Sequence, residues 1–328
     1  MKKRILSGMR PTGQLHIGHL VGALDNWIKL QDQFDCFFMV ADWHALMSEY
    51  ENPREIKKNI LENVCDWISC GIDPEKAVIF VQSHVGEHLD LAMIFSCITP
   101  LGWLERCPTY KEQIKELKGK DVNNYAFLGY PVLQAADILL YKAEVVPVGK
   151  DQLPHLELTR EIARRFNSLY KKELFPEPKA LLTESARLMG LDGRKMSKSY
   201  NNTINLSDKE IEVEKKVMQM ITDPKRIKLF DRGNPDVCNV YSYYNIFCPE
   251  KKEEVRNYCI EAKVGCTKCK KQLAGCISER LAPIQQERKK ILKDKGYLGK
   301  ILHLGAEKAK DFACLTVGQA KELVHFYV

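Results

Sequence analysis

Residues 5–24 read ILSGMRPTGQLHIGHLVGAL, an apolar run of strand length that passes through a turn into a helical pattern. Ile5–Met9 is the predicted strand, and from Leu20 onward apolar residues recur at helical spacing. The turn between them carries His16 and His19. A strand that leads directly into a helix is the unit from which sheets of parallel strands are built, so this stretch predicts an α/β fold.

The rest of the N-terminal half repeats this arrangement. Further apolar runs of strand length lie at Cys36–Ala41, Ala77–Gln82 and Val145–Val148. Helical patterns lie at Leu20–Gln31, Arg54–Cys70, Glu87–Cys97 and Tyr130–Tyr141. The strands lack polar and apolar alternation, which indicates that both faces of the sheet are covered. We predict a doubly wound parallel sheet.

The later part of the chain has a different character. Residues 99–124 are polar and basic, and we expect a helical insertion there. After residue 202 charged helical patterns dominate, and Ser207 with Glu210 predicts a capping box that opens the first of them. We therefore predict two domains, an α/β domain at 1–202 and an α-helical domain at 203–328.

The composition is that of an ordinary globular protein, with 328 residues, 45% hydrophobic and 28% charged. The apolar runs are far too short to cross a bilayer, and no apolar segment of signal-peptide length opens the chain, so we expect a cytoplasmic protein. The net charge of +7 is compatible with a polyanionic partner, but many enzymes carry as much.

Two stretches are candidates for binding phosphate. The strand-to-helix turn exposes backbone N–H groups, and His16 and His19 lie on one side of its first helical turn, with Gly18 allowing close approach. A pair of metal ligands or two ordinary surface histidines remain alternatives. The second stretch, GLDGRKMSKSYNN at residues 190–202, is too polar for a core and is either a solvated basic loop or a phosphate clamp.

These two stretches resemble the signatures of the class I aminoacyl-tRNA synthetases. PTGQLHIGH is similar to their HIGH motif, and KMSKS at residues 195–199 matches the second motif letter for letter. With ADWHAL, YPVLQAADILLY, VVPVGKDQ and HLELTREIARRFN, the chain resembles bacterial tryptophanyl-tRNA synthetases. The resemblance implies a Rossmann-like catalytic domain, a helical anticodon-binding domain, a homodimer, and the ligation of L-tryptophan to tRNA(Trp) with ATP and Mg²⁺.

The helix at Tyr130–Tyr141 is the expected site of amino-acid selection. Tyr130, Gln134 and Asp137 form a polar stripe on an otherwise apolar helix, which indicates buried groups with partners rather than a solvated edge. By the resemblance, Asp137 meets the polar end of the substrate ring, an indole N–H or a phenol O–H. Tyrosyl enzymes usually offer a tyrosine where this chain has Leu6, which favours tryptophan. Tyrosine ligation, a silent RNA-binding paralogue and a small-molecule nucleotidyltransferase remain alternatives.

The resemblance also assigns site residues. Its catalytic residues are His16, His19, Lys195 and Lys198. Its ATP contacts are Arg10, Pro11, Thr12, Gly18, His19, Gly149, Lys150, Asp151, Leu188, Lys195, Met196, Ser197, Lys198 and Ser199. Its tryptophan contacts are Leu6, His44, Tyr130, Gln134, Asp137, Val146, Val148 and Gln152. Arg10 and Gln134 depart from the family pattern, which commonly has glutamine and methionine there.

Half of the twelve cysteines crowd into residues 238–276, within the second domain. Four of them suit a metal site with a terminal CxxC, namely Cys238, Cys259, Cys266 and Cys269. Four thiolates can hold zinc or a [4Fe-4S] cluster, Cys248 competes as the first ligand, and unrelated free thiols are the remaining alternative. A resemblance to the subset of tryptophanyl-tRNA synthetases with a four-cysteine iron–sulfur site favours the cluster. Lys268, Lys270 and Lys271 flank it and are candidates for tRNA phosphates.

Overall fold

The computed structural model describes residues 2–108, 110, 124–182, 188–294 and 296–326. Its contacts divide the chain into two compact units. The first unit comprises residues 1–13, 27–184 and 294–328, and the second comprises residues 14–26 and 185–293. The last helix therefore groups with the sheet, and the turn with the two histidines groups with the KMSKS loop. The functional boundary near residue 203 stays a prediction.

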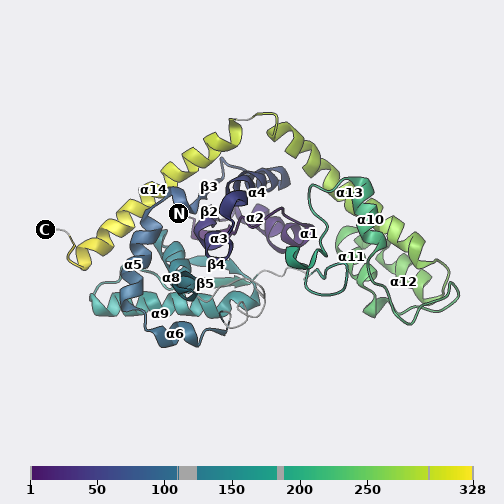
Figure 1. Cartoon of the computed structure of the whole chain (residues 1–328), viewed down its shortest axis with the longest axis horizontal. Helices are drawn as coiled ribbons and strands as arrows, with labels where there is room; N and C mark the ends of the chain where they lie inside the picture. The colour runs from purple at the N-terminus through teal and green to yellow at the C-terminus, as the bar shows by residue number, and fades with distance from the viewer. Residues whose placement is uncertain (1, 109, 111–123, 183–187, 295, 327–328) are drawn as a thin grey trace. The chain divides into compact units, whose positions relative to one another are not determined.

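The first unit is built on a five-stranded parallel sheet in the order β3-β2-β1-β4-β5 (Figure 1). The strands are β1 Arg4–Met9, β2 Asp35–Val40, β3 Ala77–Val81, β4 Val145–Val148 and β5 Lys179–Leu182. This confirms the predicted doubly wound sheet. The sequence reasoning missed β5, which lies at the edge and has no fully buried residue. The order reverses between β1 and β4, the place where such sheets bind their ligands.

Helices enclose this sheet (Figure 1). They are α3 Asp42–Glu49, α4 Ile56–Cys70, α5 Glu87–Ile98, α6 Leu101–Glu105, α8 Tyr125–Leu140, α9 Leu153–Leu169 and α14 Tyr297–Leu323. Gly305 lets α14 approach β3, because a Cβ at that position would lie 1.8 Å from the carbonyl oxygen of Ile79. Aromatic rings fill the core, where Phe37 stacks on Tyr141 with ring centroids 4.8 Å apart. Most of the predicted insertion at 99–124 lies outside the described residues.

The second unit is mainly helical. It holds α1 Ile17–His19, the π-turn η1 Leu20–Leu24, α10 Glu210–Met218, α11 Asn239–Phe247, α12 Lys252–Ile260 and α13 Cys266–Ile291; α2 Asp25–Leu30 begins in this unit and ends in the first. The predicted capping box of Ser207 was wrong. Helix α10 begins at Glu210, and Glu212 instead accepts a hydrogen bond from the backbone N–H of Lys209. Among the described residues, no helix combines the length and apolarity that a membrane crossing requires.

Candidate active site

The two signature stretches are joined by main-chain hydrogen bonds within the second unit. The segment that follows the KMSKS loop runs beside the histidine turn, with the Ile17 N–H donating to the Ile204 carbonyl at 2.9 Å. One step further, the Leu206 N–H donates to the Leu15 carbonyl at 3.0 Å. Stretches about 190 residues apart in the chain thus lie side by side.

His16 and His19 form a pair of neutral donors and acceptors. Their ring centroids are 3.8 Å apart, and the His16 backbone N–H donates to Nδ1 of His19 at 3.2 Å. Burial, aided by the charge of Lys198, lowers the pKa of His16 to about 4. Burial, His16 and Lys198 together lower the pKa of His19 well below its usual value. Since Nδ1 of His19 accepts a hydrogen bond, its proton lies on Nε2, which is left to donate to a ligand.

Space at the turn is reserved by Gly18. A Cβ there would lie 2.9 Å from Nδ1 of His16 and 3.2 Å from the sulfur of Met196. Among the described residues, Nδ1 of His16 is buried without a hydrogen-bond partner. A buried polar atom in that condition is expected to meet a ligand or water in the working protein.

The KMSKS loop is held in shape by Asn202, a residue that sequence reasoning did not single out. Asn202 is 3% exposed; its amide donates to Oδ1 of Asp192 at 2.7 Å and to the Lys195 carbonyl at 3.1 Å. Its oxygen accepts from the Ser197 N–H at 2.8 Å. Met196 is buried, so the loop is only partly the exposed segment that its composition predicted. The exposed Arg194 forms an ion pair with Asp192 at 2.6 Å.

Within the first unit, Asp137 of α8 is the centre of a buried polar cluster. Its carboxylate is 2% exposed and accepts from Nε2 of Gln82 at 2.7 Å, from Nδ1 of His88 at 2.6 Å and from Nε2 of His44 at 2.8 Å. Burial alone would raise the pKa of Asp137, but the hydrogen bonds from His44 and His88 lower it to about 2. The carboxylate is therefore ionised. Sequence reasoning found Asp137 and His44 but missed Gln82 and His88.

A second series of polar contacts begins at Tyr130, which lies about two helical turns before Asp137 on α8. The Tyr130 hydroxyl lies 2.7 Å from Nε2 of His155, and Nδ1 of His155 lies 3.0 Å from Oε1 of Gln152. Burial is the main reason that the pKa of His155 falls to about 4. A neutral ring that donates from Nδ1 to Gln152 accepts at Nε2 from the Tyr130 hydroxyl. His155 is a further residue that sequence reasoning missed.

Other predicted contacts differ in how far they are exposed. Leu6, Val146, Val148 and Leu188 are buried. Arg10, Lys150 and Asp151 are exposed, and Gln134 and Thr12 are half-buried. A Cβ at Gly149 would lie 2.6 Å from Oδ1 of the exposed Asp151, so a larger residue there would displace that side chain.

Comparison with known proteins decides the family. The model of the family "tRNA synthetases class I (W and Y)" matches residues 1–282. The chain belongs to the class I tRNA synthetases of this family. It is 51% identical to the tryptophan–tRNA ligase of Thermotoga maritima, over 98% of this chain and 99% of that protein, and 41% identical to that of Aquifex aeolicus, over 98% and 99%.

A solved structure of a synthetase of this family has the same fold as this chain. The tryptophanyl-tRNA synthetase of Campylobacter jejuni, crystallised with ADP and tryptophan, matches with a TM-score of 0.89 and 33% identity. The match covers 98% of this chain and 99% of that one. The parallel sheet, the helical C-terminal region and the two signature stretches are therefore those of the class I synthetase fold.

The four predicted cysteine ligands of this synthetase share one cavity. Cys238, Cys259, Cys266 and Cys269 all line it, together with Arg226, whose guanidinium lies 3.7 Å from the sulfur of Cys259. They come from the start of α11, from α12 and from the first turn of α13. In the part of the chain that the structure describes, no three His, Cys, Asp or Glu side chains form a group that could hold a metal ion. The iron–sulfur assignment stays a prediction.

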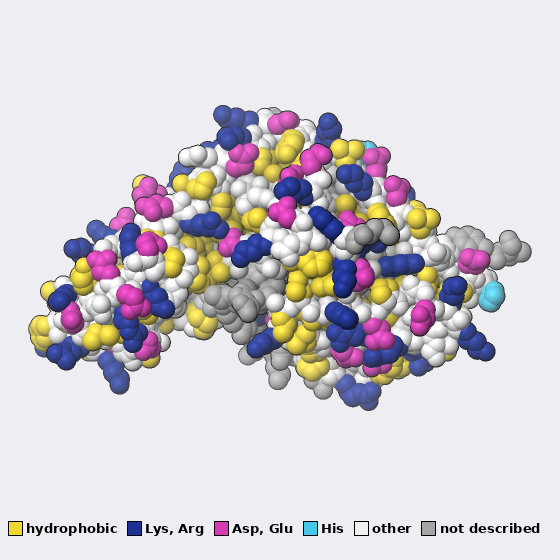
Figure 2. Space-filling view, turned by 180° about the vertical axis from the view of Figure 1, so that it is seen from behind, with side chains coloured by type: hydrophobic (Ala, Val, Ile, Leu, Met, Phe, Trp, Pro, Cys, Tyr) yellow, Lys and Arg dark blue, Asp and Glu magenta, His cyan; other side chains and the backbone are white. Residues whose placement is uncertain are grey.

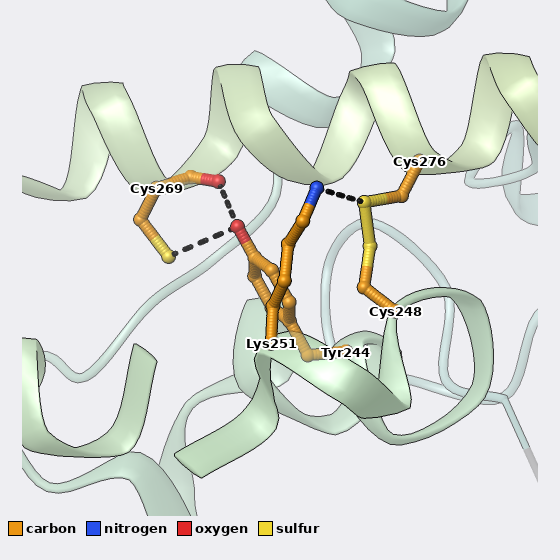
Figure 3. Close-up of a disulfide and its surroundings, with 5 residues drawn as sticks. All are labelled: Tyr244, Cys248, Lys251, Cys269 and Cys276. Carbon is orange, nitrogen blue, oxygen red and sulfur yellow. Dashed lines mark hydrogen bonds between the residues drawn. A yellow bond between two sulfur atoms is a disulfide. The ribbon is translucent and has the colours of Figure 1, made fainter. Parts of the chain in front are cut away.

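Cys248, the competing first ligand, is not among the residues that line this cavity. It is buried and forms a disulfide with Cys276 of α13 (Figure 3). Nζ of Lys251 lies 3.9 Å from the sulfur of Cys276. Tyr244 lies between the disulfide and Cys269 in Figure 3 and donates to the Cys269 carbonyl at 2.6 Å. The disulfide therefore joins the end of α11 to α13, two of the helices next to the four thiols.

The surface of the synthetase carries its positive charge in a dispersed form. On the face shown in Figure 2, Lys and Arg side chains are interspersed with Asp and Glu. Near the cysteine cavity, Lys270 donates to the Met218 carbonyl at 3.0 Å and Lys271 lies 4.0 Å from Glu214. Lys268 is exposed. Of the three lysines predicted to meet tRNA phosphates, Lys268 and Lys271 are exposed.

Proposed function

We propose that this synthetase is a tryptophan–tRNA ligase. An oxygen of the tryptophan carboxylate attacks the α-phosphorus of ATP, the bond to the β-phosphate oxygen breaks, and tryptophanyl-adenylate and diphosphate form. A hydroxyl of the terminal ribose of tRNA(Trp) then attacks the adenylate carbonyl, and AMP leaves. Neither step needs a covalent bond to the protein, so the chain is required to position the reactants and stabilise phosphate charge.

The observation that carries this proposal is the pairing of the histidine turn with the segment after the KMSKS loop. It supports a shared phosphate site to which Nε2 of His19 and the unpartnered Nδ1 of His16 contribute neutral polar groups. Lys195 and Lys198 contribute positive charge. ATP and Mg²⁺ are usual for this family, and Mg²⁺ bound to the phosphates would neutralise part of their charge. The turn after β1 and the Gly149–Asp151 segment complete the proposed ATP contacts.

Selection of tryptophan follows from the two polar chains on α8. Asp137, ionised and buried, accepts the indole N–H, while Val146 and Val148 provide apolar surface. Tyr130 and Gln152 meet the α-ammonium and carboxylate groups. Leu6 leaves a phenol hydroxyl without a second polar partner, and a site of this kind rejects the wrong substrate strongly because a buried group stays unpaired. We also infer that the chain works as a homodimer in the cytoplasm, as is usual for this family.

On the resemblance to the iron–sulfur subset of these enzymes, we propose a [4Fe-4S] cluster held by the four cysteines that line this cavity, Cys238, Cys259, Cys266 and Cys269. A zinc ion needs four sulfurs within about 4 Å of one another, whereas a four-iron cluster suits thiols that line a cavity without converging on a point. Bound there, the cluster would join α11, α12 and α13 covalently. We expect protein purified without oxygen to absorb light at about 400 nm. This absorption should be lost in Cys266→Ser and retained in Cys248→Ser. A colourless zinc-containing preparation would contradict the proposal.

Amino-acid-dependent diphosphate exchange tests the main proposal. The purified chain is incubated with ATP, labelled diphosphate and either L-tryptophan or L-tyrosine. We expect exchange with tryptophan and at least roughly 1,000-fold less with tyrosine, because the site is built for one polar partner. Exchange with tyrosine alone would identify a tyrosine–tRNA ligase, and exchange with neither would favour the silent paralogue.

A further inference from the structure

The carboxylate of Asp137 has two oxygens with different surroundings. Oδ1 accepts two hydrogen bonds, from Nε2 of Gln82 at 2.7 Å and from Nδ1 of His88 at 2.6 Å. Oδ2 accepts one from a described residue, Nε2 of His44 at 2.8 Å. A carboxylate oxygen has room for about two such bonds. Oδ1 is therefore filled by the protein, and Oδ2 is the oxygen that is left to meet a substrate.

The ionised carboxylate of Asp137 fixes the direction of the hydrogen bonds that it accepts. An ionised carboxylate only accepts, so His88 carries a proton on Nδ1. Its Nε2 lies 2.8 Å from the hydroxyl of Tyr141, which donates to it when the ring is neutral. With a neutral His88 ring, the hydrogen bonds run from Tyr141 through His88 to Asp137, and each donor is polarised by the next.

The residues behind Oδ1 have no freedom to turn. Gln82, His88 and Tyr141 are fully buried. The ring of His88 stacks near Phe80, with centroids 6.0 Å apart. They come from three different elements, the turn after β3, α5 and the end of α8. A side chain that is locked by packing and hydrogen bonds can orient a partner to the accuracy that recognition requires.

We propose that His88 is a positioning residue for amino-acid selection. By holding Oδ1 of Asp137, it turns Oδ2 toward the substrate ring and sets the direction in which an indole N–H is accepted. His88 acts through Asp137 and does not itself touch the substrate. The inference rests on the proposed function, and in particular on Asp137 as the indole acceptor.

The test compares two substrates that differ in one group. L-tryptophan donates from its indole N–H, whereas β-(3-benzothienyl)-L-alanine has sulfur at that position and nearly the same shape. For His88→Leu we expect kcat/KM in diphosphate exchange to fall roughly 30-fold with tryptophan, mainly through KM, since a charged hydrogen bond loses its alignment. With the sulfur analogue we expect a fall of no more than about 3-fold, because that ring makes no such bond.

Two further variants keep the comparison decisive. His88→Gln retains one amide donor toward Oδ1, and we expect it to restore part of the preference for tryptophan. It also serves if His88→Leu does not fold. The control is His84→Gln, which changes an exposed histidine in the turn after β3. It should leave kcat/KM unchanged with both substrates. Equal losses for the two substrates in both His88 variants would overturn the inference and leave the proposed function standing. Absence of tryptophan-dependent exchange in the unchanged chain would instead overturn the proposed function.

Discussion

Lowering the pH should destabilise the first unit through His155, and the size of the effect follows from its burial. The pKa of His155 is about 4 in the folded chain, against 6.5 for an exposed imidazole, chiefly because of burial. Below pH 6.5 the unfolded chain binds a proton that the folded chain refuses. The free energy of unfolding therefore falls by about 1.4 kcal/mol per pH unit, which is about 2 kcal/mol at pH 5. The loss is complete near pH 4, where the folded chain also binds the proton.

Urea unfolding followed by tryptophan fluorescence measures this loss. All four tryptophans belong to the first unit, and Trp27 and Trp67 are buried in its core, so the signal reports the unit that contains His155. His155→Gln keeps a polar group but cannot bind the proton. Its free energy of unfolding should be lower at pH 7.5, yet should fall by about 2 kcal/mol less than that of the unchanged chain between pH 7.5 and 5.

The control for general acid effects is His303→Gln, which changes an exposed histidine of α14. It should follow the unchanged chain at every pH. If His155→Gln and the unchanged chain lose stability in parallel between pH 7.5 and 5, then His155 is not held neutral by burial. The direction assigned to the hydrogen bonds from Tyr130 and to Gln152 would then be wrong as well.

Three other perturbations test the second unit. Lys195→Ala should slow adenylate formation roughly 100-fold or more and should change tryptophan affinity little, whereas the control Arg194→Ala should leave both the rate and the affinity unchanged. Rapid-quench kinetics measures the rate and equilibrium binding measures the affinity. Equal losses in rate and affinity would exclude a role confined to the transition state. Asn202→Ala removes three hydrogen bonds from the KMSKS loop, so adenylate formation should slow roughly 10-fold and protease cleavage within residues 190–202 should become faster, whereas unchanged cleavage would show that Asn202 does not order the loop. The disulfide between Cys248 and Cys276 closes a loop of 28 residues, so its reduction should lower the free energy of unfolding by about 3.6 kcal/mol at 25 °C. In urea unfolding, the unchanged chain with dithiothreitol should approach the stability of Cys248→Ala without dithiothreitol. An unfolding curve that does not respond to dithiothreitol would refute this value.

Of the strands that the sequence predicted, β2 and β3 give the clearest apolar signal. β2 and β3 are almost wholly buried, so their runs stand out as continuous apolar segments. β5 has four residues at the sheet edge and pairs with β4 alone, so it lacks the apolar signal. The capping error has a local cause. Ser207 lies before the first residue of α10, and the position next to the helix belongs to Lys209, whose type gives no cap signal.

The site residues divide in the same way. His16, His19 and Lys195 are found because their motifs are short and continuous in the chain. His88 lies 49 residues from its partner Asp137, so no spacing rule links them. The sequence left Cys248 as a competitor of Cys238, and the disulfide of Cys248 with Cys276 is a contact that the sequence does not specify. Interactions of this kind become visible only once the fold has brought the elements together.

The buried histidines share a physical device that fits the proposed reaction. In each case one ring nitrogen faces a fixed partner, a backbone N–H for His19, Gln152 for His155 and the carboxylate of Asp137 for His88. That partner determines the tautomer, so the role of the other nitrogen is settled without any change in charge. Burial keeps His19 and His155 neutral near pH 7. A neutral donor near phosphate does not add to the electrostatic attraction that must be overcome when diphosphate leaves. The lysines of the KMSKS loop can supply positive charge when the loop closes.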